Sequence, residues 1–323
     1  MHERLLTSAE PSIRLLARTR VLGEEPAPEL LEQVRASERA EALRRSGLQS
    51  LHPYAKWAGA HWSLVMLAEI GYPPGDEALV PLREHVLGWL LSDRYEERWV
   101  PPVHGRSRLH ASQDANAVWA LLRLGLADRR IDRLVQRLIG AQWPDGGWNC
   151  DPREAAHVSS FEETLIPLRA LALHGGDAAD EAASRAAEVL LERKLFRRRS
   201  DGQPIAARFV QLHFPTYWHY DLLFALKVIA EAGYIGDPRC ADAFELLESK
   251  RLPDGGFPAE ARYYRGSSAT AGRSPVDWGG TSKRHANEWV TVDALAVLSA
   301  RDAKRPPVGG PHAAASLSPL PPP

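Results

Sequence analysis

Five histidines recur along the chain, each just before a stretch with the composition of an apolar helix: His61, His110, His157, His213 and His285. Consecutive members are 49, 47, 56 and 72 positions apart, and the last interval contains the insertion ARYYRGSSATAGRSPVDWGGTSKR. Imidazole carries protons near neutral pH and binds metal ions. If the helices are equivalent members of a ring, we expect the imidazoles to lie at one rim and to point toward a shared opening.

Acidic and further imidazole groups follow within one or two turns: Asp114, Glu162 with Glu163, His219 with Asp221, and Glu288 with Asp293. A charge on an otherwise apolar helix is costly unless it is paired or used, because desolvation disfavours the charged form. We therefore predict that the acid, base or ligand is among Asp114, His157, Glu163, His219 and Asp221. In the structural alternative, the histidines bridge helix ends and the carboxylates lie near helix N-termini, where the macrodipole favours them.

The same atoms suit a metal ion. Histidines from several helices, together with a carboxylate, can bind zinc or iron. Ligands that come from separate repeats leave no local spacing in the sequence, so the ligand set stays open. A divalent metal, zinc in the first place, is the cofactor that this alternative implies.

Aromatic side chains occur in the same stretches: Trp62, Trp119, Trp218 and Trp289. They are expected either to pack in the core, above all Trp119, or to line an apolar cavity and shield a carbocation. The predicted cavity lining consists of His61, Trp62, His110, His213, Trp218, His285, Trp289 and Asp293. Lys56 precedes the first of these stretches, although a single lysine is usually a solvated surface charge.

A second series of markers sets the repeat that must position these groups. Turn-like segments centre on Asp93, Asp145, Asp201 and Asp254, at separations of 52, 56 and 53 residues. Each interval holds two helix-like runs. The first is apolar on most faces, as in ETLIPLRALAL, and the second is charged on one side, as in EAASRAAEVLLERK. This pattern predicts inner helices that are covered by outer helices.

The predicted fold class is all-α, an (α/α) toroid of about six helix pairs. Its inner helices are expected near residues 11–22, 54–71, 111–125, 158–174, 215–233 and 286–300. Such a ring closes on itself and leaves no exposed end. We predict one domain over residues 1–302, with an N-terminal helix pair in 1–50 and the repeats in 51–302, and a disordered Pro-rich tail over 303–323.

Two turn sequences resemble known motifs. QWPDGGW, at 142–148, resembles the QW motif of squalene-hopene and oxidosqualene cyclases, and LPDGGF, at 252–257, resembles its shorter form in protein prenyltransferases. The resemblance implies a divergent member of the terpenoid cyclase and protein prenyltransferase superfamily. In that reading the following residues brace the fold and take no part in chemistry: Gln142, Asp145, Gly146, Gly147, Trp148, Asp254, Gly255 and Gly256.

The chemical motifs of those families are incomplete. Opposite the DxDDTA acid motif of class II cyclases stands Ser-Gln-Asp-Ala at 112–115, which keeps the central acid as Asp114 but not its flanking carboxylate. The prenyltransferase zinc pair has Asp two residues before Cys, whereas here Cys150 precedes Asp151 directly. No DDxxD cluster for magnesium occurs in the chain.

Composition limits the partners. A formal net charge of -1 gives no basic field for nucleic acid. Two cysteines, Cys150 and Cys240, are too few for a disulfide framework, so we expect a reducing, cytoplasmic setting. No stretch has the roughly 18 apolar residues of a membrane span, although peripheral membrane contact stays open.

These observations predict an enzyme of the cyclase (isomerase or lyase) or transferase type, acting on a hydrophobic substrate in the toroid, with an isoprenoid as the leading class. Two alternatives use the same cavity: a non-catalytic ligand-binding module and a histidine-liganded metalloenzyme. A protein-binding scaffold is less favoured because the outer helices carry ordinary charged faces. Substrate and oligomeric state stay open.

Overall fold

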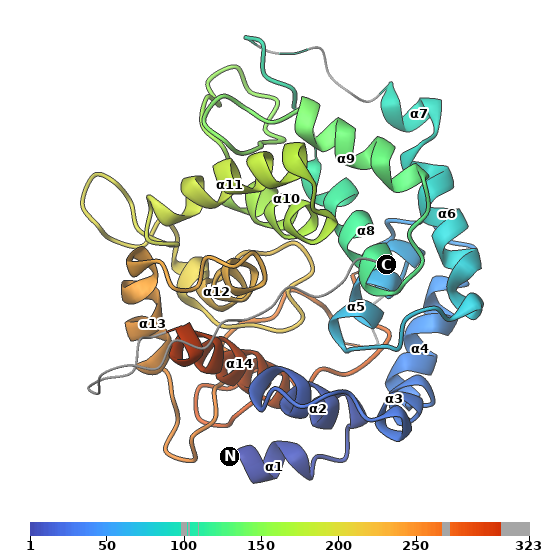
Figure 1. Ribbon diagram of the computed structural model, residues 1–323, viewed down its shortest axis with the longest axis vertical. Helices are drawn as coiled ribbons and strands as arrows, with labels where there is room; N and C mark the ends of the chain where they lie inside the picture. The colour runs from blue at the N-terminus through green and yellow to red at the C-terminus, as the bar shows by residue number, and fades with distance from the viewer. Residues whose placement is uncertain (98–101, 103, 109, 267–271, 305–323) are drawn as a thin grey trace, which may run out of the picture.

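The computed structural model describes residues 1–97, 102, 104–108, 110–266 and 272–304. Within these residues the regular elements are helices, and β-pairing is limited to isolated bridges. The predicted all-α class is therefore confirmed. Figure 1 shows the helices in two concentric rings, which define an (α/α) toroid.

The inner ring consists of α2 (Pro11–Leu16) with a π-helical turn (Ala17–Val21), α5 (Ala60–Glu69), α8 (Ala111–Arg123), α10 (Phe161–His174), α12 (Leu222–Glu231) and α14 (Glu288–Lys304). From α5 to α14 each inner helix packs against the next, and α14 packs against α2 and its π-helical turn. Figure 1 shows α2 between α14 and α5. The predicted inner stretches thus form the inner ring in chain order.

The outer elements are α1 (His2–Leu6), α3 (Pro28–Arg35), α4 (Glu38–Gly47), α6 (Val80–Leu90), α7 (Asp93–Glu96), α9 (Arg130–Gly140), α11 (Asp177–Leu191) and α13 (Ala241–Glu248). Inner α5 is buried along its whole length. Outer α9 buries Ile131, Leu134, Val135 and Leu138, a stripe one helix face wide. Apolar sequences are therefore enclosed, and sequences with one polar face cover them.

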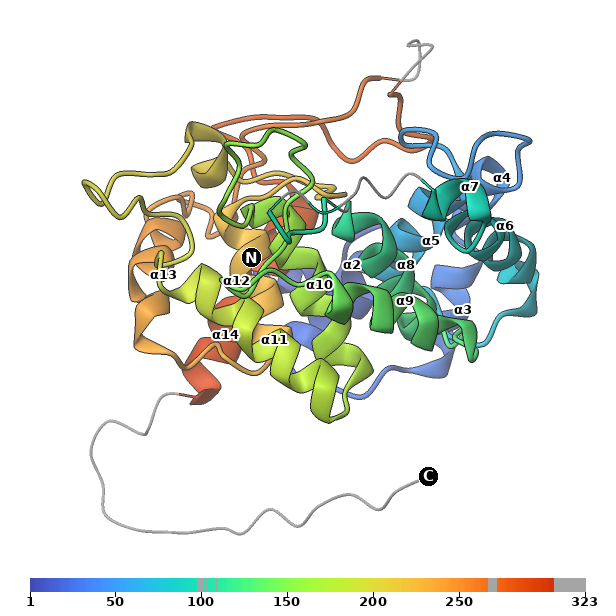
Figure 2. The same ribbon diagram turned by 90° about the horizontal axis from the view of Figure 1, so that it is seen from above.

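The inner helices run in the same direction. The first turns of α8 and α10 meet, where the Ser112 amide donates to Glu163 Oε2 at 2.8 Å. The end of α5 meets the second half of α12, where Lys227 Nζ donates to Glu69 Oε2 at 2.8 Å. Figure 2 shows the long connections gathered on one side of the ring, and we call this side the loop face.

Two inner helices begin later than the sequence predicts. Helix α5 begins at Ala60, because Gly59 passes so close to the chain that a Cβ there would lie 2.2 Å from the Pro53 carbonyl oxygen. Helix α12 begins at Leu222, where Asp221 is the N-cap and its Oδ1 accepts the Phe224 amide at 2.7 Å. Trp218, His219 and Asp221 therefore precede the helix on which we expected them.

Both ends of the chain also differ from expectation. The N-terminal segment contains α1 and a separate α4 in addition to the expected helix pair. Helix α14 includes Ala303 and Lys304, which we had assigned to the tail. The rest of that tail, 305–323, lies outside the described residues. Among the described helices, none is long and apolar enough to cross a membrane.

The QWPDGGW turn follows outer helix α9 and ties it to its neighbours. Gln142 Nε2 donates to the carbonyls of Gly146 and Ala182, at 2.7 and 2.8 Å. Trp148 Nε1 donates to the Leu138 carbonyl at 2.9 Å, and the Trp148 ring is buried. LPDGGF follows α13 in the same way. Both turns join an outer helix to the loop face.

Candidate functional site

Aromatic and imidazole rings gather on the loop face, drawn from the connections before α5 and α12, from α5 and α6, and from the 249–287 connection. We call the following rings the aromatic cluster: Tyr54, Trp57, His61, Trp62, Trp89, Tyr217, Trp218, His219 and Tyr263. Trp57 stacks on Tyr217 with 4.0 Å between ring centroids. His219 stacks on Tyr263 at 3.8 Å. Five of these rings precede the late starts of α5 and α12 and therefore lie in connections, where they pack against one another: Tyr54, Trp57, Tyr217, Trp218 and His219.

Two imidazoles of the cluster are neutral. Burial lowers the pKa of His61 to about 3, and neither of its ring nitrogens has a hydrogen-bond partner among the described residues. Burial, followed by the charge of His213, lowers the pKa of His219 to about 3. His219 Nδ1 and the indole N–H groups of Trp62 and Trp218 are also buried, and the part of the chain that the structure describes offers them no partner. Such orphaned polar atoms are rare in folded proteins and mark a ligand, an ordered water or a catalytic role.

Lys56 extends over the aromatic cluster. Its Nζ lies 5.3 Å from the Trp57 ring centroid and 5.2 Å from that of Trp218. An ammonium group at this distance is attracted by the negative face of an indole. Lys56 is solvent-exposed, as expected for a single lysine, and its ammonium group lies near the rings of both Trp57 and Trp218.

A second polar group lies beside the cluster. His110, the N-cap of α8, Cys150, in the turn after α9, and Glu163, in the first turn of α10, bring one ligand atom each to within 4.8 Å of one another. His110 Nδ1 lies 3.6 Å from Glu163 Oε1. Burial, helped by the Glu163 carboxylate, raises the pKa of the Cys150 thiol to about 12. We call these residues the His110–Cys150–Glu163 trio.

Tyr54 connects the trio with the aromatic cluster. Its ring packs against His61 and Trp62, with centroid distances of 5.2 and 4.9 Å. Burial raises the pKa of the Tyr54 hydroxyl, and the charges of Glu163 and Cys150 act in the same direction. The trio and the cluster are thus neighbouring parts of one region.

The predicted acid Asp114 is instead held in an ion pair. Arg137 of α9 donates to both of its carboxylate oxygens, at 2.7 and 2.8 Å, and the Tyr95 hydroxyl donates to Oδ1 at 3.2 Å. Burial raises the pKa of Asp114 and Arg137 opposes that rise. Because arginine can only donate, a proton on either oxygen would displace one of these bonds. The contacts favour a structural role, in which Asp114 joins α8 to α9.

Asp221 is likewise engaged. Its Oδ2 lies 2.7 Å from His213 Nδ1 and accepts the His213 amide at 2.9 Å. His213 Nε2 remains buried without a partner. The His213 and His219 rings are 6.1 Å apart, so His213 lies at the edge of the aromatic cluster.

The five spaced histidines do not converge. His157 Nδ1 bonds the Ala155 carbonyl of its own loop at 2.7 Å, and the residue is largely solvent-facing. His285 Nδ1 lies 3.1 Å from Ser282 Oγ within the last connection and is exposed. His61 lies on α5, whereas the other four histidines precede the first residue of their helices. A shared rim is therefore seen for part of the set only.

Several other candidates have structural partners. Trp289 stacks on Phe214 at 5.1 Å. Asp293 pairs with Lys227 at 2.8 Å. Trp119 lies under the Arg169 guanidinium, 3.5 Å from its ring centroid. These side chains belong to the packing of the inner ring.

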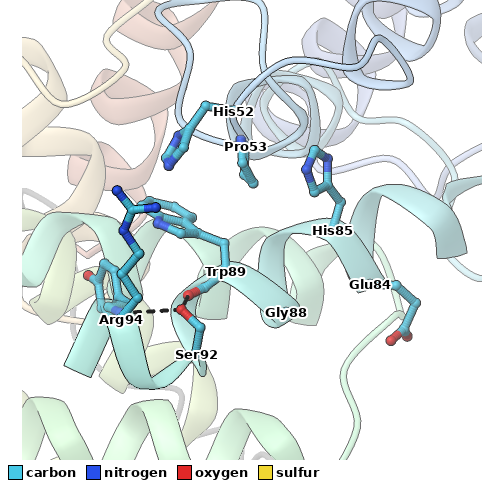
Figure 3. A pocket seen from close by; sticks show the side chains of 9 residues that line it. His52, Pro53, Glu84, His85, Gly88, Trp89, Ser92 and Arg94 are labelled. Atoms are coloured by element: carbon cyan, nitrogen blue, oxygen red, sulfur yellow. Dashed lines mark hydrogen bonds between the residues drawn. The ribbon is translucent and has the colours of Figure 1, made fainter. Parts of the chain in front are cut away.

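A pocket of about 440 Å³ opens next to the cluster. It is lined by residues of the loop before α5, of α6 and of α7: His52, Pro53, Glu84, His85, Gly88, Trp89, Ser92, Arg94 and Tyr95. Figure 3 shows His52 and Arg94 close to the Trp89 ring, with His85 farther along α6. Trp89 also contacts Tyr54, with 5.5 Å between centroids. The pocket therefore shares a wall with the aromatic cluster.

Sequence reasoning missed several of these groups, among them Tyr54, Trp57, Tyr217, Tyr263 and Cys150 as a ligand. Tyr54, Trp57 and Tyr217 fall in stretches that we predicted as helical, but they precede the observed starts of α5 and α12, and Tyr263 lies in the connection before α14. Cys150 was considered only against the zinc motif of protein prenyltransferases, in which Asp stands two residues before Cys. His110 and Glu163 were both among the predicted residues because they stand at helix starts. Cys150 does not, and only the packing of the chain brings it to them.

Comparison with known proteins adds little to this geometry. No protein-family model matches the chain, and no curated protein sequence matches it. Among solved structures, the chain is similar to a variant of the type II terpene cyclase MstE from Scytonema in complex with its substrate geranylgeranyl dihydroxybenzoate. The TM-score is 0.44 and the identity 14%, over 92% of this chain and 88% of that chain. The toroid assignment stands on the ring of helices itself.

Proposed function

We propose that the chain is an enzyme that acts on a hydrophobic substrate at the aromatic cluster, with isoprenoids as the leading substrate class. The observation that carries this proposal is Lys56, an ammonium group held over Trp57 and Trp218 beside neutral imidazoles. A surface of indoles that holds a cation suits a reaction in which positive charge develops on a hydrocarbon.

The neighbouring groups supply the remaining parts of such a reaction. Trp57, Trp62 and Tyr217 are buried and offer a dry part of the cluster, where a carbocation would be protected from capture by water. His61 and His219 are unprotonated near neutral pH, because burial lowers both pKa values to about 3. A neutral imidazole can accept the proton that ends a carbocation reaction. The adjoining pocket beside Trp89 offers room for part of a substrate chain.

In this proposal Glu163 and its neighbours activate the substrate, which is the first step of the reaction. Asp114 and Asp221, the two other predicted carboxylates at the starts of inner helices, are engaged by Arg137 and His213. The charge of Glu163 acts on the hydroxyl of Tyr54, a member of the cluster, and raises its pKa. We therefore assign activation of the substrate to the trio that contains Glu163, in a cyclase-type or transferase-type conversion.

The proposal is tested with paired ligands that share one isoprenoid chain. One ends in a trimethylammonium group, and the other ends in the neutral tert-butyl group of the same shape. We expect the cation to bind about 3-fold to 30-fold more tightly, because a cation–π contact contributes roughly 0.5–2 kcal/mol. The measurement is isothermal titration calorimetry with the full chain.

Two variants sharpen this test. Trp218→Leu should abolish the preference for the cation, and Lys56→Met should increase it, because Lys56 no longer competes for the two indoles. The affinity for the neutral ligand serves as the control in both variants. Equal affinities for cation and isostere in the wild-type protein would overturn the proposal.

A non-catalytic module that binds a hydrophobic ligand is the second candidate. The pairing of Asp114 with Arg137 favours it, because both oxygens of the expected acid are engaged by the guanidinium group. Incubation with isoprenoid alcohols and diphosphates, followed by mass spectrometry of the products, separates the two. Binding without any product favours the module.

A further inference from the structure

We propose that His110, Cys150 and Glu163 together bind one zinc ion. This site goes beyond the proposed function and does not depend on it, since metal binding is measured without any substrate. Three chemically different ligands meet here from three elements: the start of α8, the turn after α9 and the start of α10.

The spacing of the ligand atoms fits a tetrahedral ion. Zinc bonds of about 2.0–2.1 Å to nitrogen and oxygen place these two atoms about 3.3 Å apart, and sulfur lies about 3.5 Å from either. His110 Nδ1 and Glu163 Oε1 are already 3.6 Å apart. All three ligand atoms lie within 4.8 Å of one another. A side-chain movement of about 1 Å therefore completes the site.

The carboxylate is held in place by its surroundings. Glu163 Oε2 accepts the Ser112 amide at 2.8 Å, and the Glu163 amide donates to Ser160 Oγ at 3.1 Å in the cap of α10. Oε1 is left on the side of His110. Hydrogen bonds of this kind orient metal ligands and raise affinity. They mean that the buried member of the trio loses little freedom on binding.

The accessibility of the trio provides a route for the ion. Glu163 is buried, Cys150 is half-buried, and the His110 side chain is 61% exposed. An ion can reach the buried carboxylate and the thiol from the His110 side.

The donor set selects zinc. Magnesium and calcium prefer sites made of oxygen atoms, whereas nitrogen, sulfur and oxygen together suit zinc. Three protein ligands leave the fourth position for water or another molecule, as in catalytic zinc sites. The charges of Glu163 and Cys150 both act on the Tyr54 hydroxyl, so the trio and this ring of the aromatic cluster belong to the same region of the loop face.

The test uses the full-length chain, freed of metal with a chelator. Zinc binding is measured by competition with a chromophoric chelator, and cobalt(II) replaces zinc for spectroscopy. We expect one zinc per chain. With cobalt we expect the near-ultraviolet charge-transfer band of a thiolate ligand together with the intense visible bands of tetrahedral geometry.

Variants identify the ligands. Cys150→Ser should abolish the thiolate-to-cobalt band, and Glu163→Gln and His110→Asn should weaken zinc binding at least about 100-fold. Cys240→Ala, which removes the other cysteine of the chain, should keep both the stoichiometry and the band. Circular dichroism shows which variants fold. If Glu163→Gln, a change at a buried residue, does not fold, the zinc affinity of His110→Asn decides the test. The proposal is overturned if the wild-type chain binds no zinc at micromolar concentration, or if Cys150→Ser binds zinc and cobalt as the wild type does.

Discussion

The loop face and the opposite half of the inner ring bury polar groups in different ways. Far from the loop face, Arg169 donates to Glu69 and to Glu231, and Lys227 donates to Glu69 and Asp293. On the loop face, both nitrogens of His61 and the N–H groups of two indoles are buried and have no partner within the described ranges. One region pairs its charges, and the other keeps neutral polar atoms unpaired.

The two kinds of buried polar group have different effects on stability and on ligand binding. A buried ion pair is costly to break, because the remaining partner is left charged in an apolar interior. An unpaired neutral group costs stability in every folded molecule, and a ligand that bonds to it would recover that cost. The charge network therefore joins the inner helices, and the loop face is the region in which we propose that a ligand binds.

The largest expected effect comes from the charge network. Arg169→Met leaves Glu69 and Glu231 without their shared guanidinium, and the side chain it replaces is 2% exposed. We expect the free energy of unfolding to fall by about 3–5 kcal/mol. Chemical denaturation with urea measures this loss.

The matched control is Arg239→Ala. Arg239 pairs with Glu188 at 2.7 Å, but the two side chains are 36% and 51% exposed. Solvated pairs contribute little, so we expect a change below about 1 kcal/mol. Equal effects of the two variants would remove the contrast on which the comparison depends.

The second prediction concerns the frame of the loop face. Trp148→Ala removes a buried ring and its hydrogen bond to Leu138, so we expect a loss of about 3–4 kcal/mol in unfolding free energy. Trp218→Ala should cost roughly half as much, because the Trp218 ring is only half-buried. Thermal denaturation measures both, and a Trp148→Ala protein with an unchanged melting temperature would contradict the bracing role of the turn.

The smallest expected effect is a pH dependence of stability that arises on the loop face. In the unfolded chain each imidazole takes up a proton as pH falls through about 6.5. In the folded chain the pKa values of His61 and His219 are about 3. Between these limits the unfolded state binds more protons, so the free energy of unfolding falls as pH is lowered.

The expected slope approaches about 1.4 kcal/mol per pH unit for each of the two histidines. It is measured by urea denaturation between pH 6.5 and 5, above the range in which most carboxylates titrate. His61→Phe and His219→Phe should each remove about half of the slope. A double variant that keeps the full slope would show that these imidazoles titrate normally in the folded chain.

The fold was largely predictable from residues that act locally. The apolar run before His174 and the charged face of 177–191 specify an inner and an outer helix through periodicity alone. The starts of α5 and α12 were not predictable in the same way. Gly59 is required there by a close approach to Pro53, and such an approach is a property of the folded chain.

The candidate site was predicted only in part. Glu163, His219 and His61 were identified because polar groups stand out in apolar stretches. Asp114 was expected to be an acid, base or ligand, and in the structure Arg137 of the next helix donates to its carboxylate. Nothing in the order of residues states that a guanidinium 23 positions away will reach that carboxylate.

The sequence by itself determined the helical periodicity, the assignment of inner and outer faces and the turns that join them, because these depend on residues a few positions apart. Only the tertiary structure decided which polar groups are paired and which remain available. His110, Cys150 and Glu163 come from separate elements, and Lys56 meets Trp218 across the ring. Burial and charge pairing depend on the packing of the closed ring, so the chemistry of the loop face emerges only when the chain has folded.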